Sequence, residues 1–148
     1  MAKRAVLLSI KPCFADLIFN GTKTVELRRH APKIKSGDLV FLYVASPIKA
    51  VRGAFSVEEV VSGTPRSVWR RFGDLTGITK QEFDAYFVGK QTACAIVVRD
   101  AWEMKGSISL KKLRGNNKNF RPPQSFRYQC PKEFQKSHGF SLPKRLAA

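Results

Sequence analysis

The passage from a helix into a strand around Gly21 most constrains how this chain can fold. Residues 12–20 place apolar side chains at helical spacing, and Asn20 and Gly21 both tolerate the left-handed conformation that ends many helices. Residues 24–28 include several that favour strands. We therefore expect a short helix that ends at Gly21 and a strand that begins a few residues later.

Strand alternation assigns separate roles to the side chains of this segment. Val25 and Leu27 would face the core, and Glu26 and Arg28 would share the opposite face, two residues apart. The same alternation places Lys23 on the side of Val25. Glu26 is the single carboxylate of a strongly cationic segment, so its role needs an explanation.

The charge balance indicates a polyanionic partner. The 148 residues include 27 Lys and Arg against 11 Asp and Glu, a formal net charge of +16 with a pI near 10.3. Such a field attracts nucleic acid. Because the cations are spread along the chain and form no amphipathic basic helix, nucleic acid is favoured over a membrane surface. A basic surface that serves only solubility is the alternative interpretation.

Cysteine and histidine spacing argues against a disulfide framework and against a zinc site. Cys13, Cys94 and Cys130 are odd in number and include no CxxC pair, and His30 and His138 lie far apart in the sequence. No apolar run is long enough to span a membrane. We expect a cytoplasmic monomer without a metal or another cofactor.

The pattern of predicted elements favours an α+β fold. We expect one domain over residues 1–148, with a core over about 5–140 and a helical insertion over about 62–89, whose aromatic residues should pack in the core. A further short helix should end at Gly115, and the tail from Lys144 onward should be frayed. Strands do not alternate regularly with helices, which predicts a small, strongly bent β-barrel of five to six strands with short helices packed around it. The expected strands cover residues 5–10, 24–28, 39–44, 50–60, 91–102 and a final one near 126–128.

The first candidate site is the charged group on and beside the strand after Gly21. It consists of Lys11, Lys23, Glu26, Arg28 and Arg29. A cleft that binds RNA needs cations for phosphates and an acceptor for the amino groups of bases, and Glu26 can supply the acceptor. An ion pair that only holds Arg28 or Lys23 in place is the alternative.

The second candidate site lies near the end of the chain. Its expected nucleic-acid contacts are Arg121, Gln124, Ser125, Arg127 and Tyr128. Aromatic residues interleaved with Arg can stack on bases and hold phosphates. The alternative is that Phe126 closes the core while Arg127 is solvated.

Catalytic patterns are sparse in this sequence. The chain contains no P-loop, no GxSxG and no metal-binding cluster. A metal-independent hydrolysis could use Lys23 to polarise the substrate, Thr24 as the nucleophile and Glu26 as the base.

Several of these residues resemble the ASCH domain family. Residues 21–28, GTKTVELR, fit the GxKxxExR pattern of that family, and the lead-in SIKP at residues 9–12 is similar to its start. The helix at 109–114 followed by PPQSFRY at 122–128 resembles the helix and final strand of many members. The resemblance runs from about residue 6 to about residue 128.

The resemblance implies a PUA-like fold with an RNA-binding cleft, and a role in RNA metabolism or transcription coregulation. One enzymatic branch of the family removes acyl groups from modified cytidines with a Lys and a Thr of this strand and a distant Glu. Lys23 matches that Lys, whereas Glu26 occupies the position of that Thr. Another branch is described as ribonucleases.

We therefore predict a nucleic-acid-binding module that prefers RNA, single-stranded or structured, with DNA as the other nucleic acid that its charge would attract. The alternative prediction is a metal-independent hydrolase or ribonuclease that acts on RNA or on an acylated nucleoside.

Overall fold

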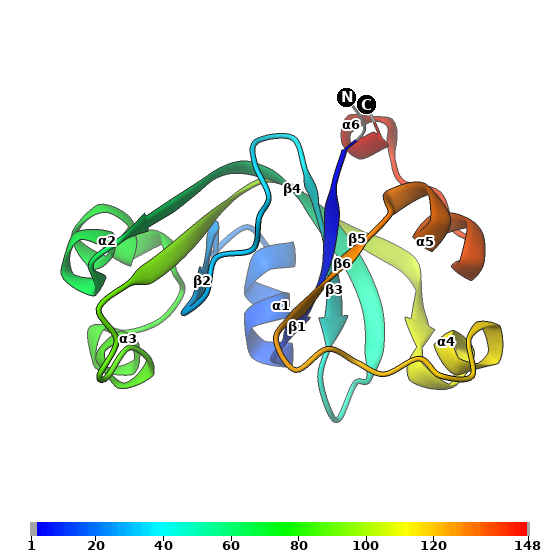
Figure 1. Ribbon diagram of the computed structural model, residues 1–148, viewed down its shortest axis with the longest axis horizontal. Coiled ribbons are helices and arrows are strands. Elements are labelled where there is room, and N and C mark those ends of the chain that lie inside the picture. The colour runs from blue at the N-terminus through cyan, green and yellow to red at the C-terminus, as the bar shows by residue number, and fades with distance from the viewer. Residues whose placement is uncertain (1–2, 148) are drawn as a thin grey trace.

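The fold is built on one bent sheet. A computed structural model describes residues 3–147 of the chain (Figure 1), and within this range six strands pair in the order β2-β5-β4-β3-β1-β6. β1 and β3 pair in parallel, and the other neighbours are antiparallel. The strands are β1 (Ala5–Ile10), β2 (Val25–Arg28), β3 (Leu39–Val44), β4 (Ala50–Gly63), β5 (Ala93–Ser109) and β6 (Phe126–Gln129).

Short helices surround this sheet. They are α1 (Pro12–Phe19), α2 (Pro65–Phe72), the 3-10 turn η1 (Gly73–Leu75), α3 (Lys80–Tyr86), α4 (Leu110–Asn116), α5 (Pro131–His138) and α6 (Lys144–Ala147). The sheet forms a half-barrel with β2 and β6 at its edges. The α+β fold predicted from the sequence, a bent sheet with short helices around it, is confirmed.

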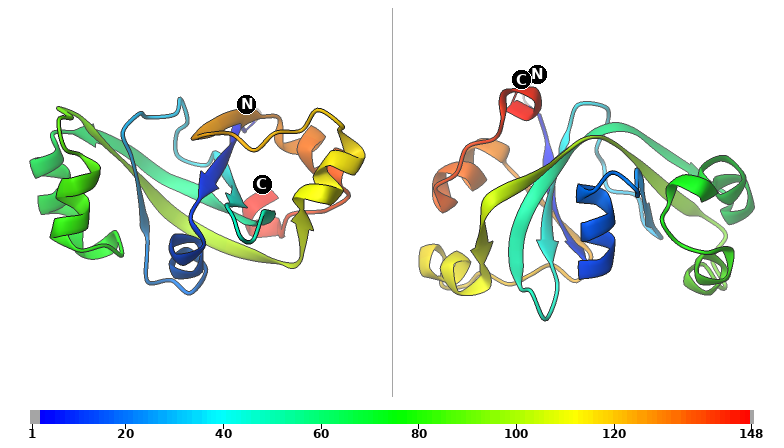
Figure 2. Two further views of the ribbon diagram at one scale, coloured as in Figure 1. Left: turned by 90° about the horizontal axis from the view of Figure 1, so that it is seen from below. Right: turned by 180° about the vertical axis from the view of Figure 1, so that it is seen from behind.

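The two longest strands connect two ends of the molecule. β4 and β5 pair from Ala50–Ser109 to Gly63–Ala93, and at their far end the chain forms α2, η1 and α3, which we call the helical lobe. Figures 1 and 2 show this lobe on one side of the sheet and helices α4 and α5 on the other. Thr64 caps α2, and Thr79 and Glu82 form a capping box on α3, so local hydrogen bonds define both helix starts.

Three hydrophobic clusters stabilise the fold. One lies between β1, β3 and the helices α4 to α6, and a second lies under α1 on the other side of these strands. The third fills the helical lobe, where Phe83 and Phe87 pack near Val25 and Leu27 of β2. The aromatic residues of α3 are therefore mainly core residues, as expected, and they fix β2 against the lobe.

Three local predictions are wrong. β5 continues to Ser109 because its pairing with β4 resumes at Val51–Ile108. Helix α4 passes through Gly115 and ends at Asn116, since its buried Leu113 anchors it to the core. The segment from Lys144 forms α6 because Leu146 is fully buried.

Gly53 lies where β4 changes register and where the sheet leaves no space for a side chain. The register of β4 shifts between Val51 and Gly53, and a Cβ on Gly53 would collide with the carbonyl oxygen of Trp102 and lie 2.8 Å from a ring carbon of Phe19. Because a backbone carbonyl cannot move aside cheaply, we expect Gly53→Ala to lower the free energy of unfolding by about 2–3 kcal/mol. Urea unfolding monitored by circular dichroism measures this.

Gly115 offers the matched control. It lies inside α4, and a Cβ there would meet no atom within 4 Å. Gly115→Ala should stabilise the protein by about 0.5–1 kcal/mol, because alanine is the better helix former. Equal effects of the two substitutions would contradict the role assigned to Gly53.

Candidate functional site

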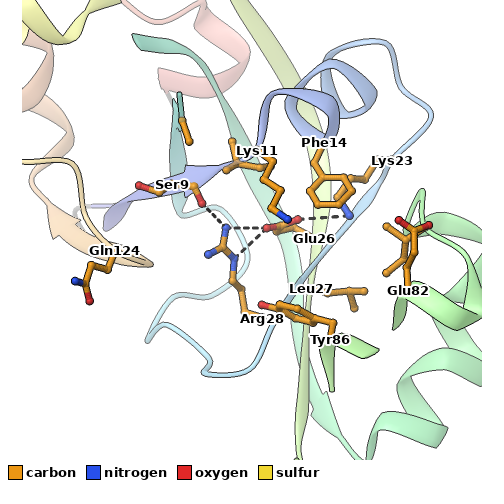
Figure 3. A pocket seen from close by; sticks show the side chains of 13 residues that line it. Ser9, Lys11, Phe14, Lys23, Glu26, Leu27, Arg28, Glu82, Tyr86 and Gln124 are labelled. Carbon is orange, nitrogen blue, oxygen red and sulfur yellow. Dashed lines mark hydrogen bonds and ion pairs between the residues drawn. The ribbon is translucent and has the colours of Figure 1, made fainter. Parts of the chain in front are cut away.

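A cleft lies between α1, β2 and the helical lobe. Its volume is about 410 Å³, and Figure 3 shows the side chains that line it. The lining combines cations, carboxylates and two aromatic rings. The residues are Ser9, Ile10, Lys11, Phe14, Lys23, Glu26, Leu27, Arg28, Ala45, Ile78, Glu82, Tyr86 and Gln124.

The helix-to-strand junction positions the floor of this cleft. Gly21 adopts a left-handed conformation with φ of 84°, which ends α1 as the sequence predicts. The backbone N–H of Lys23 then donates to the carbonyl oxygen of Leu17 at 3.0 Å and holds the chain against the helix that it has just left. β2 begins at Val25 and pairs with β5, so Glu26 projects into the cleft while Val25 packs in the lobe core.

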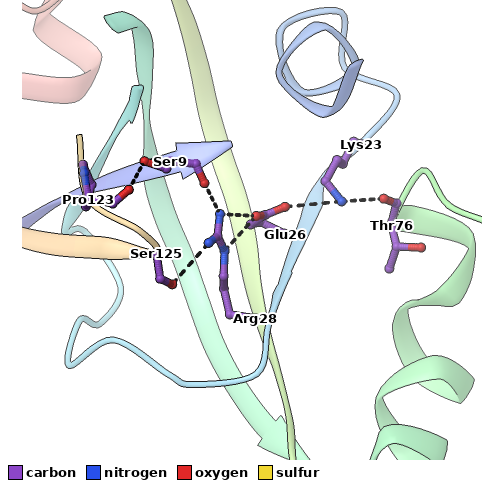
Figure 4. Close-up of polar contacts among 7 residues, drawn as sticks. All are labelled: Ser9, Lys23, Glu26, Arg28, Thr76, Pro123 and Ser125. Atoms are coloured by element: carbon purple, nitrogen blue, oxygen red, sulfur yellow. Dashed lines mark hydrogen bonds and ion pairs between the residues drawn. The ribbon is translucent and has the colours of Figure 1, made fainter. Parts of the chain in front are cut away.

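Three charged side chains form a buried cluster at the floor. Glu26 Oε1 lies 3.4 Å from Lys23 Nζ, and Glu26 Oε2 lies 2.8 Å from Arg28 Nη2 and accepts from Arg28 Nε at 3.0 Å. The side chains of Lys23, Glu26 and Arg28 are 2%, 6% and 11% exposed. One carboxylate thus neutralises two cations in a site with little access to water, which explains the acidic residue in this cationic segment (Figure 4).

Lys23 lies where the sequence does not place it. It precedes β2, so strand alternation does not apply to it, and its ammonium group turns to the side of Glu26 instead of Val25. Nζ donates to the carbonyl oxygen of Thr76 at 2.6 Å and lies 5.2 Å from the centre of the Phe14 ring. Burial lowers the pKa of Lys23, and the nearby Glu26 carboxylate only partly offsets this effect.

Arg28 connects three separate parts of the chain. Besides its contacts with Glu26, Arg28 Nη2 donates to the carbonyl oxygen of Ser9 at 2.7 Å, and Nη1 lies 3.4 Å from Ser125 Oγ. Ser9 Oγ in turn donates to the carbonyl oxygen of Pro123 (Figure 4). The guanidinium group therefore fixes β2 relative to β1 and to the segment that enters β6.

The two remaining members of the first candidate group, Lys11 and Arg29, lie at different places. Lys11 is exposed and lines the cleft. Arg29 turns away from it, donates to the carbonyl oxygen of Tyr86 at 2.8 Å and lies over the Tyr86 ring at 4.1 Å. Thr24, the nucleophile of the hydrolysis hypothesis, is not among the residues that line the cleft.

The second candidate group is not brought together at one site. Gln124 lines the cleft, and Ser125 contacts Arg28. Arg127 donates to the carbonyl oxygen of Arg121 at 2.8 Å, and both residues line a separate depression beside α4 and α5. The Tyr128 hydroxyl accepts from the backbone N–H of Lys33 at 2.8 Å, at yet another place. Phe126 packs against the core cluster under α1.

The sequence does not predict that the helical lobe forms one wall of the cleft. Ile78, Glu82 and Tyr86 line the cleft, and Thr76 binds Lys23 through its carbonyl oxygen. Their distance from β2 in the sequence gives no indication of this contact. The half-buried state of Tyr86, between two buried phenylalanines of the same lobe, marks the boundary between core and cleft.

Two further properties concern the chemistry available to residues 3–147. Over this range, no three His, Cys, Asp or Glu side chains gather in a way that could hold a metal ion. Nor does the same range include a helix with the length and apolar character needed to cross a membrane.

Comparisons with known proteins place these features in a family. The model of the ASCH domain matches residues 8–110. An ASCH domain-containing ribonuclease from Zymomonas mobilis is 33% identical over 134 residues, which are 90% of this chain and 90% of that protein. The large ribosomal subunit protein uL22 of Ureaplasma parvum is 29% identical over 83% of this chain, a match that spans only 38% of the ribosomal protein.

Solved structures agree with this match. The crystal structure of ASCH from Zymomonas mobilis superposes with a TM-score of 0.83 at 33% identity and covers 89% of this chain and 92% of its own. The N-terminal domain of McrB from Staphylothermus marinus has a TM-score of 0.57 at 10% identity, with 94% of this chain and 95% of that chain covered, which is a likeness of fold alone.

Proposed function

This chain belongs to the ASCH domain family, and on that premise we propose that it is an RNA-binding protein that takes a single strand of RNA into the cleft beside β2. The observation that carries the proposal is the combination of charge and shape in one cleft. Lys11 offers a cation for a phosphate, and Phe14 and Tyr86 offer ring surface for a base. The net charge of +16 attracts the strand.

The relative from Zymomonas mobilis supports the same nucleic acid. It is named a ribonuclease, and the match covers nine tenths of both chains. The GxKxxExR residues that define the resemblance are Gly21, Lys23, Glu26 and Arg28, and the last three form the floor of the cleft. A role in RNA metabolism follows from this proposal.

Lys11 provides the first test of RNA binding. It is exposed at the cleft, and within residues 3–147 its side chain makes no hydrogen bond or ion pair. If Lys11 contacts one phosphate, Lys11→Gln should lower the affinity for single-stranded RNA about 5-fold at about 0.1 M salt and reduce the salt slope by about 0.7. Fluorescence anisotropy at two salt concentrations measures both quantities.

The control for Lys11 is a cation remote from the cleft. Lys90 is exposed and does not line it, so Lys90→Gln should change the affinity much less. Wild-type binding that does not respond to salt, or no binding of RNA at low salt, would reject the proposed function.

Ribonuclease activity is the second candidate function, and a specific observation favours it over hydrolysis of an acylated nucleoside. A relative that is 33% identical over 90% of this chain is named a ribonuclease. Burial lowers the pKa of Lys23, which makes its ammonium group a better proton donor to a leaving oxygen. Both Glu26 oxygens contact cations, so neither is free to face a substrate hydroxyl.

A further inference from the structure

The positive charge of this chain is concentrated in its last part, from the end of β5 onward. Residues 105–147 include eleven Lys and Arg and a single acidic residue, Glu133, which is a net charge of +10. Residues 1–104 include sixteen Lys and Arg and ten Asp and Glu, a net charge of +6. Most of the excess therefore lies on α4, α5, α6 and the segments that join them, which we call the basic end.

Several cations of the basic end make no contact that holds the fold together, whereas Arg114, Arg127 and Arg145 each donate to a backbone carbonyl oxygen. The ion pairs found within residues 3–147 involve Lys23, Arg28, Arg52, Arg71, Lys80 and Arg99, all of which precede the basic end. The side chains of Lys111, Lys112, Lys118 and Arg121 are exposed, and in the described part of the chain they make no hydrogen bond. Their charges are therefore free to bind an external anion.

The segment from Asn117 to Ser125 joins the basic end to the cleft. It leaves α4 and passes beside β1, where Gln124 lines the cleft and Ser125 contacts Arg28 (Figure 1). Arg121 and Arg127 line a depression on this path, together with the polar side chains of Asn116, Asn119 and His138. A chain of phosphates that leaves the cleft past Gln124 would meet cations and amide donors there, with Glu133 as the one carboxylate among the lining residues.

We propose that the basic end is a second RNA-contact surface, which holds the phosphate backbone of the strand as it leaves the cleft past Gln124 and runs over Lys118, Arg121 and α4. This inference rests on the proposed RNA binding and extends its footprint. RNA fits better than a membrane, because the apolar residues of α4, Leu110 and Leu113, pack against the core and leave no apolar face to insert.

RNA also fits better than an acidic protein segment. The surface offers amide groups among its cations, at Asn116, Asn117 and Asn119, and such donors suit phosphate and sugar oxygens. Among the described residues, the exposed large apolar side chains are Ile48, Leu75, Val88 and Tyr128, and none of them lies on α4, α5 or α6. Protein interfaces usually include such anchors.

Two lengths of RNA test this proposal against the proposed function itself. An oligonucleotide of about 4 nucleotides can fill the cleft, and one of about 16 nucleotides can also reach the basic end, which are the limits of single-strand site sizes in other small β-folds. The variant combines Lys111→Gln, Lys118→Gln and Arg121→Gln. The matched control removes three exposed cations of the helical lobe and its edge, with Arg66→Gln, Arg70→Gln and Lys90→Gln.

We expect the basic-end variant to bind the long RNA at least about 10-fold more weakly at about 0.1 M salt, with a salt slope reduced by about 2, because about 0.7 counterions are released per phosphate contact. Its affinity for the short RNA, followed by NMR titration, should stay within about 2-fold of wild type. The control variant should bind both RNAs nearly as wild type does.

Other outcomes would overturn the proposal in distinguishable ways. Equal losses in the two triple variants would show that only the overall field matters. If the long RNA binds no better than the short one, the basic end does not contact RNA, and binding at the cleft is unaffected by this result. Tighter binding to vesicles of anionic lipid than to the long RNA would contradict the second RNA-contact surface in the same way. Failure of the wild type to bind either RNA would reject the proposed function as well.

Discussion

Glu26→Gln is expected to destabilise the protein by about 3–5 kcal/mol. The substitution keeps the shape of the side chain but leaves the buried charges of Lys23 and Arg28 without their shared carboxylate, and a buried ion pair that loses one partner costs this much. Lys23→Met in the Glu26→Gln background should recover part of the loss, because one of the two unpaired cations is removed. Chemical unfolding of the single and double variants measures both effects.

The pH dependence of this loss has a definite sign. Without Glu26, the pKa of Lys23 should fall further below its ordinary value than burial already places it. The folded variant therefore releases the proton of the Lys23 ammonium group at a lower pH than the folded wild type does. The stability difference between them should therefore shrink with rising pH, since the folded variant binds fewer protons in that window.

An exposed ion pair provides the control for Glu26. Glu59 lies 2.8 Å from Arg71, and both side chains are about half exposed. Glu59→Gln should cost no more than about 1 kcal/mol, because solvent screens such pairs. If Glu26→Gln costs no more than Glu59→Gln, the buried cluster does not organise this region, and Glu26 would be free for another role.

Lys23→Met is expected to separate RNA binding from RNA cleavage. If the bound strand is also cleaved, removing the ammonium group should lower the single-turnover rate by about 10²–10⁴-fold, the usual contribution of an acid–base group. RNA affinity should change much less, since the exposed Lys11 remains at the cleft. The variant should stay folded, because Glu26 and Arg28 are left as a one-to-one pair. Labelled RNA in excess enzyme, with anisotropy on the same samples, gives both numbers.

Two outcomes would decide between the candidate functions. If the wild-type protein binds RNA and leaves it intact over a day, it is an RNA-binding protein and not a ribonuclease. A wild type that cleaves RNA while Lys23→Met retains its rate would place the catalysis at another group. Acylated cytidine, tested in the same way, checks the hydrolase alternative.

Local sequence determined where the lobe helices begin and where α1 and α5 end. The left-handed Gly21 ends α1, Thr64 and Thr79 cap the helices of the lobe, and Gly139 ends α5 with φ of 67°. These features depend on hydrogen bonds and conformational preferences within a few residues, and such interactions are visible in the sequence. The buried run at residues 39–44 is predictable for the same reason, because all six of its side chains are apolar.

Long-range contacts decided how far β5 and α6 extend and what the elements touch. β5 extends to Ser109 because the neighbouring β4 continues to pair with it, and α6 is held by the burial of Leu146. The position of Lys23 depends on the carbonyl oxygen of Thr76, 53 residues away in the sequence. No local pattern encodes such a contact, since it arises only when the helical lobe packs on β2.

The candidate site shows the same division. The sequence alone identified Lys23, Glu26 and Arg28 as a group, because their spacing follows a family pattern. Only the tertiary structure brought Ser9, Tyr86 and Gln124 to the same cleft and turned Arg29 away from it. The physical reason is that charge and spacing are properties of a segment, whereas a cleft is the space between segments that the hydrophobic core brings together.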